Sequence, residues 1–133
     1  MNLTTPVLLV ASTFCYFAVA AEAPSLPPPA SRQGVSFAKD ILPVFEKSCV
    51  KCHSGERPKA KLRLDTLEGT LKGSSEGKVV VPGDSAKSQL VLTVGHQVDK
   101  DLWMPPPGNK QGIKPLAAEE ISLIRAWIDQ GAK

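Results

Sequence analysis

Apolar residues recur at helical spacing near the start of the region that reads as globular. Phe37, Ile41 and Phe45 are each four residues apart, so in a helix they would share one face. This spacing predicts a first helix over about Phe37 to Ser48. Pro43 lies inside it, and because proline has no backbone N–H, the helix is expected to kink there or to begin late.

The clearest amphipathic stripe lies at the C-terminal end of the chain. It predicts a last helix over Ala118 to Gln130, with Gly131 as a natural stop. Four large apolar residues form its predicted buried face: Ile121, Ile124, Trp127 and Ile128.

Two shorter helices are predicted between these ends. One begins at Asp65, which forms a capping box with the glutamate three residues later, and stops at Gly73. The other follows a Pro-Gly turn, with Asp84 as its N-cap and Gly95 at its end. The predicted fold class is therefore all-α, with about four short helices joined by long loops. The 12 Pro and 10 Gly residues are too closely spaced for a long coiled coil.

The first 20 residues have the pattern of a signal peptide. Residues 6–20 carry no charge and end in Ala18-Val19-Ala20, which suits cleavage between Ala20 and Ala21. Residues 1–5 lack the usual Lys or Arg, so an uncleaved anchor helix remains the alternative. We expect export to a bacterial periplasm and no membrane span in the mature chain.

The mature chain divides into a linker and one domain. Residues 21–34 are rich in Pro, Ser and Ala and are predicted to be an extended linker that cannot order itself. Residues 35–133 are predicted to form the domain. Its aromatic residues are few, so the core is thin and a cofactor or a partner is expected to complete it.

Length and charge exclude several classes of protein. A chain of 133 residues is too short for a large α/β enzyme, and no further apolar run is long enough to span a membrane. The net charge of +3 comes from mixed signs along the chain, so nucleic-acid binding is not expected.

The two cysteines outside the predicted signal peptide lie in the motif Cys49-Val50-Lys51-Cys52-His53. In an exported chain, C-x-x-C-H is the attachment signature of c-type haem. Each thiol adds across one haem vinyl group, its sulfur bonding one carbon and its proton the other. His53 is then the proximal iron ligand.

Other chemistries fit this motif less well. A disulfide between Cys49 and Cys52 would span a tight turn and leave His53 without a role. A redox-active dithiol would need a βαβ context that the chain lacks. Zinc would need four ligands, and the adjacent Cys52 and His53 do not easily reach one tetrahedral ion together.

The sixth iron ligand is predicted to be Met104. It is the only methionine besides Met1, and it opens a Pro-Pro-Pro turn that would hold a thioether at a fixed height. The alternative is His96, which otherwise reads as a solvated residue just past a helix end. Arg63 is a possible contact for a haem propionate, because a guanidinium matches a carboxylate fork, but a solvated arginine fits equally.

Five blocks of the chain together resemble the planctomycete-type cytochrome c domain, a branch of the small mono-haem cytochromes c. The blocks are CVKCH at 49–53, LRLDT at 62–66, VPGD at 81–84, MPP at 104–106, and EEI, WI and GA between 119 and 132. The resemblance implies a small cytochrome c fold wrapped around one covalently attached haem. It also implies that the first and last helices cross, through Phe37, Phe45, Trp127 and Ile128. Ala117 departs from the Ser or Thr that commonly caps the last helix of this family.

These features predict a single-electron carrier and not an enzyme, since both axial positions of the iron would be filled. The expected cofactor is one haem c, the expected partners are periplasmic redox proteins, and the chain is expected to be a monomer. The alternative is a haem-binding docking or sensor module within a larger exported redox complex.

Overall fold

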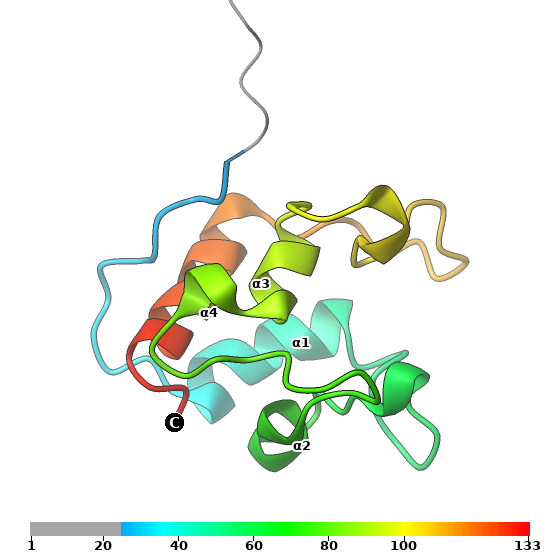
Figure 1. The fold of residues 1–133 in the computed structure, drawn as a ribbon, viewed down its shortest axis with the longest axis horizontal. Coiled ribbons are helices and arrows are strands. Elements are labelled where there is room, and N and C mark those ends of the chain that lie inside the picture. Colours follow the sequence, from blue (N-terminus) through cyan, green and yellow to red (C-terminus); the bar gives the residue numbers. More distant parts are fainter. Residues whose placement is uncertain (1–24) are drawn as a thin grey trace, which may run out of the picture.

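The computed structural model describes residues 25–133, and this part of the chain is helical without strands (Figure 1). Its α-helices are α1 Leu42–Ser48, α2 Leu67–Lys72, α3 Gln89–Val94 and α4 Ala118–Asp129. Short turns of other helix types precede or separate them: η1 Phe37–Ile41, η2 Lys59–Lys61, η3 Ser85–Lys87 and η4 Lys100–Leu102. The predicted all-α class is confirmed. The predicted signal peptide and the first four linker residues lie outside the described residues.

The predicted first helix divides into η1 and α1, and Pro43 is the physical reason. The chain enters through a π-helical turn capped by Ser36, whose Oγ accepts the N–H of Lys39 at 3.2 Å. Pro43 lies in the first turn of α1, where its missing N–H has no intrahelical partner to lose. The α-helix therefore begins late.

No helix among residues 25–133 is long and apolar enough to cross a bilayer.

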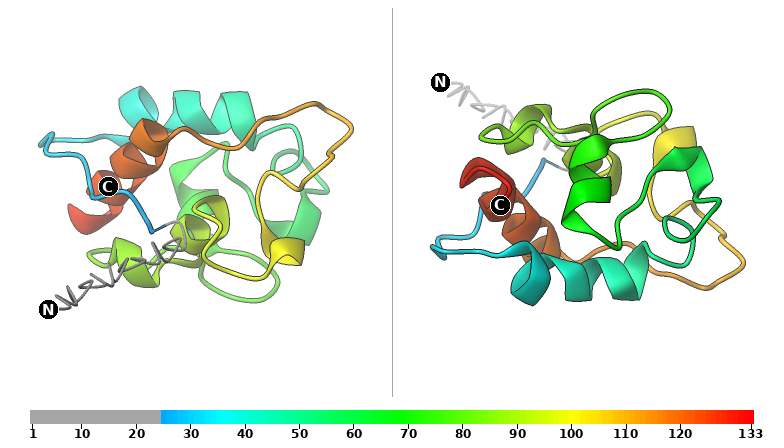
Figure 2. Two further views of the ribbon diagram at one scale, coloured as in Figure 1. Left: turned by 90° about the horizontal axis from the view of Figure 1, so that it is seen from above. Right: turned by 90° about the horizontal axis from the view of Figure 1, so that it is seen from below.

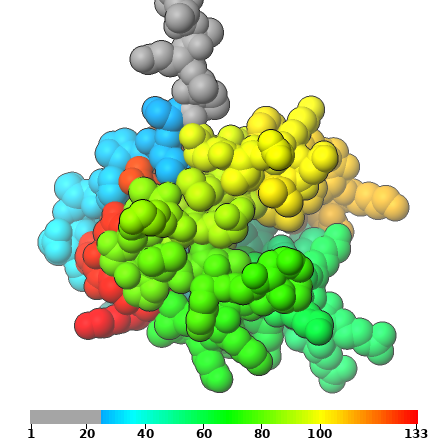
Figure 3. All heavy atoms as spheres, viewed as in Figure 1, coloured from blue at the N-terminus to red at the C-terminus, as the bar shows by residue number. Residues whose placement is uncertain are grey.

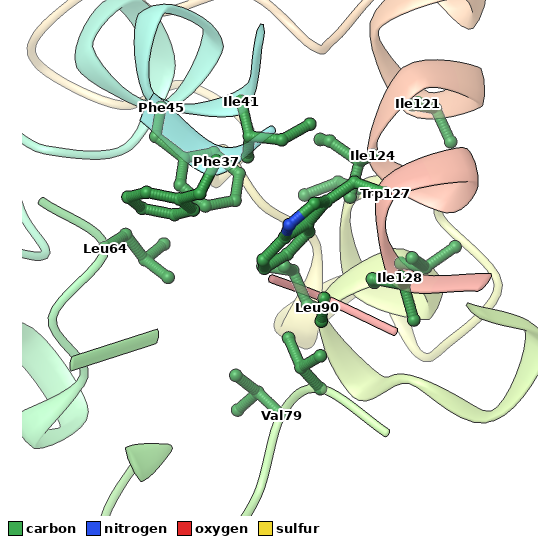
Figure 4. Close-up of a cluster of buried hydrophobic side chains, with 14 of the residues drawn as sticks. Phe37, Ile41, Phe45, Leu64, Val79, Leu90, Ile121, Ile124, Trp127 and Ile128 are labelled. Atoms are coloured by element: carbon green, nitrogen blue, oxygen red, sulfur yellow. The ribbon is translucent and has the colours of Figure 1, made fainter. Parts of the chain in front are cut away.

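The first and last helical segments pack against each other through aromatic side chains (Figure 4). Phe37 lies edge-on to Phe45, with ring centroids 6.0 Å apart, and 5.6 Å from the ring of Trp127. Phe45, Trp127 and Ile128 are fully buried. Figure 2 shows α4 lying beside the η1–α1 segment in the views from above and below. The implied crossing of these segments is thus present.

Two predicted N-caps differ from those in the structure. Thr66, not Asp65, is the N-cap of α2, and its Oγ1 accepts the N–H of Gly69 at 3.0 Å. Asp84 caps the short turn η3 by accepting the N–H of Lys87, and α3 begins afterwards at Gln89, with Ser88 as its N-cap. The predicted stops at Gly73 and Gly95 are both C-caps.

Residues 25–34, here called the N-terminal strap, correct the prediction of an unpacked linker. They are extended, as expected, but they lie along α4 (Figures 1 and 3). The carbonyl of Pro27 accepts a hydrogen bond from Arg125, and the N–H of Ala30 donates to the carbonyl of Ser122 at 2.9 Å. Gln130 Nε2 donates to the carbonyl of Arg32 at 2.8 Å. These hydrogen bonds, together with the packing of Leu26 and Ala30 against the core, hold the strap in place.

Candidate functional site

A cavity of about 490 Å³ opens into the helical core. Its volume lies within the range usual for cofactor and ligand sites. Its apolar lining residues come from several separate segments of the chain: Leu62, Leu64, Val79, Leu90, Val94 and Leu116. The cavity also receives four candidate site residues: Cys49, Cys52, His53 and Met104.

The turn after α1 places both cysteines and His53 on this cavity. The N–H groups of Cys52 and His53 donate to the carbonyl of Cys49, at 3.1 and 3.0 Å. This tight turn holds the two free thiols and the imidazole close together on one segment.

The electrostatic surroundings of Cys49 disfavour its thiolate. Burial, followed by the charges of Glu120 and Cys52, raises the pKa of Cys49 to about 12. Redox-active dithiols depend on a thiol with a lowered pKa. The raised pKa of Cys49 is therefore the opposite of what a redox-active dithiol needs.

The ring of His53 is held by the backbone. His53 is 9% exposed, and its Nδ1 lies 3.2 Å from the carbonyl oxygen of Lys59. When Nδ1 carries the ring proton, it donates a hydrogen bond to this carbonyl. Burial lowers the pKa of His53, against the opposing effect of the hydrogen bond to the Lys59 carbonyl, and so favours the neutral ring. A neutral imidazole whose Nδ1–H is bound to a carbonyl offers Nε2 as a metal ligand.

Met104 reaches the same cavity from a distant loop. Its N–H donates to the carbonyl of Thr93 in α3 at 3.3 Å, and both residues line the cavity. Pro105 is buried directly behind it, whereas the prolines that follow are exposed. The loop thus presents a thioether to the cavity that holds the thiols and the imidazole.

Comparison with known proteins identifies the segment that builds this cavity. Residues 49–108 match the family described as planctomycete cytochrome C. The resemblance drawn from the sequence motifs is confirmed, and it indicates a haem-binding redox protein. No curated protein and no solved structure matches the chain.

The donor set of this cytochrome c segment fits a haem. The attachment thiols, an oriented neutral imidazole and a thioether meet in one largely apolar cavity. Those are the groups that a c-type haem requires, and the apolar lining suits the faces of the macrocycle.

Two further residues of the cytochrome c segment do not line the cavity. The guanidinium of Arg63 forms a two-pronged ion pair with Asp65, through Nε at 3.1 Å and Nη2 at 2.7 Å. The structure thus gives no support to a propionate contact at Arg63. His96 also lies outside the lining, with its ring stacked on Trp103. It is partly buried and not the solvated residue that its position past α3 suggested.

Sequence reasoning missed the backbone group that orients His53. It also missed the polar residues that line the cavity. The carbonyl of Lys59 accepts a hydrogen bond from the imidazole of His53, and Lys59 also lines the cavity. A backbone carbonyl carries no sequence signal, so this contact could not be predicted. The other polar lining residues come from α1, α3 and two loops: Ser48, Ser74, Glu76, Lys78, Gln89, Thr93, Asn109 and Gln111.

Proposed function

We propose that the protein is an exported mono-haem c-type cytochrome that carries single electrons in the periplasm. Cys49 and Cys52 form the thioether bonds, and His53 and Met104 are the axial ligands. One observation carries the proposal: two thiols, an imidazole and a thioether line one apolar cavity, although Met104 lies 51 residues beyond His53 in the chain.

The chain's own residues have distinct tasks in this proposal. A haem bound here supplies an iron that alternates between Fe(II) and Fe(III) by gaining or losing one electron. The Cys49–His53 turn fixes the position of the ring, and the Lys59 carbonyl holds His53 in its ligating orientation. The apolar lining excludes water, so little solvent has to reorganise when the charge of the site changes.

A carrier function follows from the axial ligands. With His53 and Met104 both bound, no position remains open for a substrate, and we propose that the protein is not an enzyme. It accepts one electron from a reduced periplasmic partner and passes it to an oxidised one. A thioether ligand favours Fe(II), which predicts a relatively high reduction potential.

Two measurements test the attachment of the cofactor. The mass of the purified protein should exceed that of residues 21–133 by one haem, and the haem should stay with the denatured chain. Haem that acid-acetone extracts would contradict thioether attachment, and a mass increase of two haems would contradict a single site.

Substitution of Met104 tests the sixth ligand. The oxidised protein should show the weak far-red charge-transfer band of thioether ligation. Met104→Ala should abolish that band, lower the potential and allow the reduced iron to bind carbon monoxide. Pro107→Ala is the matched control, because Pro107 belongs to the same loop but does not line the cavity. A far-red band that survives Met104→Ala would refute the assignment.

A further inference from the structure

His96 and Trp103 stack face to face beside the loop that carries Met104. Their ring centroids are 4.2 Å apart, and the ring planes differ by only 7°. His96 follows Gly95, the C-cap of α3, and Trp103 directly precedes Met104. The stack therefore joins the end of a helix to the first residue before the thioether.

Hydrogen bonds close the segment between the two rings. Trp103 Nε1 donates to the carbonyl of Val98 at 2.8 Å, which holds the indole against its own loop. The N–H groups of His96 and Met104 both donate to the carbonyl of Thr93, at 3.4 and 3.3 Å. The beginning and the end of the loop thus meet at one carbonyl of α3.

The helix end that carries His96 is itself fixed from its other side. A Cβ at Gly95 would collide with Leu26 of the N-terminal strap and with the carbonyl of Val91. Leu26 therefore packs directly on the backbone of Gly95. The end of α3 that carries His96 thus contacts Leu26 of the strap as well as the loop that leads to Met104.

The chemistry of His96 fits stacking and not ligation. Within residues 25–133, its Nε2 is buried and has no hydrogen-bond partner, and His96 does not line the cavity. Its φ of 56° lies in the left-handed region, which histidine enters more readily than bulky apolar residues. That backbone requirement explains why an imidazole, and not a phenyl ring, lies against Trp103 despite the unpaired nitrogen.

We propose that His96 and Trp103 form a clamp that positions the Met104 loop. This inference rests on the proposed ligation of the iron by Met104. An exogenous ligand can bind only when the thioether has dissociated, so its apparent affinity reports the fraction of open protein. A clamp that holds the loop keeps that fraction small.

The test measures imidazole binding to the oxidised holoprotein, with the far-red band as a second readout. His96→Asn removes the ring but keeps a residue that tolerates the left-handed backbone. Trp103→Leu removes the other ring. Each should retain the band and raise the apparent imidazole affinity by roughly two- to tenfold, the equivalent of one aromatic pair. Because the two rings act as one contact, the double variant should differ little from either single variant.

A control separates the clamp from general destabilisation. Thr66→Ala removes the N-cap of α2, which does not line the cavity, and should lower the melting temperature while leaving the imidazole affinity unchanged. Unchanged affinity in His96→Asn and Trp103→Leu would overturn the clamp alone. A far-red band missing from the unsubstituted protein, together with His96→Asn as the variant that opens the iron to imidazole, would make His96 the ligand and overturn both proposals. A band missing from the unsubstituted protein would overturn ligation by Met104, and the clamp with it.

Discussion

At the scale of single residues, Glu120 joins the two helical segments next to the site. Its carboxylate accepts from Lys47 Nζ at 2.8 Å and from the N–H of Ala117 at 2.8 Å. The second bond supplies part of the capping that Ala117 cannot provide through its own side chain. One carboxylate thus ties α1 to the start of α4.

This contact predicts a specific loss of stability in acid. The hydrogen bond from Lys47, followed by that from Ala117, lowers the pKa of Glu120 from its ordinary value of 4.5. A lowered pKa in the folded protein means that the stabilisation is present above the unfolded pKa. It is lost as the pH falls through the folded value. Glu120→Gln should lower the free energy of unfolding at pH 7 by about 0.5–1 kcal/mol.

Denaturant titrations across pH check this prediction. The difference between the original protein and Glu120→Gln should shrink towards zero as the pH falls well below 4.5. Glu119→Gln, at the exposed neighbouring position, is the matched control and should show little difference at any pH. A difference that stays constant down to the lowest pH would mean that the ion pair does not contribute.

At the residue level, sequence reasoning was most specific where one chemistry dominated. The spacing of Cys49, Cys52 and His53 and the unique Met104 identified residues that the fold brings to one cavity. The cap of α2 was placed one residue early because Asp65 and Thr66 are both good N-caps. In the structure, the local ion pair with Arg63 engages the carboxylate of Asp65, and Thr66 caps the helix.

At the scale of elements, the apolar stripes were sufficient to predict the helices. The spacing of Phe37, Ile41 and Phe45, and the stripe on α4, correspond to faces that are buried against each other. The N-terminal strap could not be predicted in the same way. Its contacts run from backbone groups to side chains about 98 positions away, and composition does not show such contacts.

Truncation of the strap should separate its structural role from haem attachment. A chain that begins at Val35 behind another signal peptide should still attach haem, because no strap residue lines the cavity. It loses the hydrogen bonds at Pro27, Ala30 and Arg32, which together contribute about 2–4 kcal/mol. Thermal unfolding should show a clearly lower midpoint than a chain that begins at Ser25, with the same absorption spectrum. An unchanged midpoint would show that the strap does not stabilise the domain.

At the scale of the whole molecule, the short helices surround a cavity that their own side chains do not fill. The aromatic contact of Phe37, Phe45 and Trp127 lies at one end of the core. The core is thin, as expected from the sequence, because the cavity occupies the space beside it. The cavity could be anticipated from composition, but its lining could not, because it comes from segments with no common pattern.

That space predicts that the chain depends on its cofactor to fold. In the haem-free chain, the apolar side chains that line the cavity of about 490 Å³ would lack packing partners on that side. Small domains have only about 5–15 kcal/mol of total stability. Cys49→Ser combined with Cys52→Ser, purified without haem, should therefore unfold without a sharp transition and expose apolar surface to a dye such as ANS. Cys49→Ser alone is the control, since Cys52 can still form one thioether and keep the cavity filled. A haem-free double variant that melts as sharply and as high as the holoprotein would show that the fold does not need the cavity to be occupied.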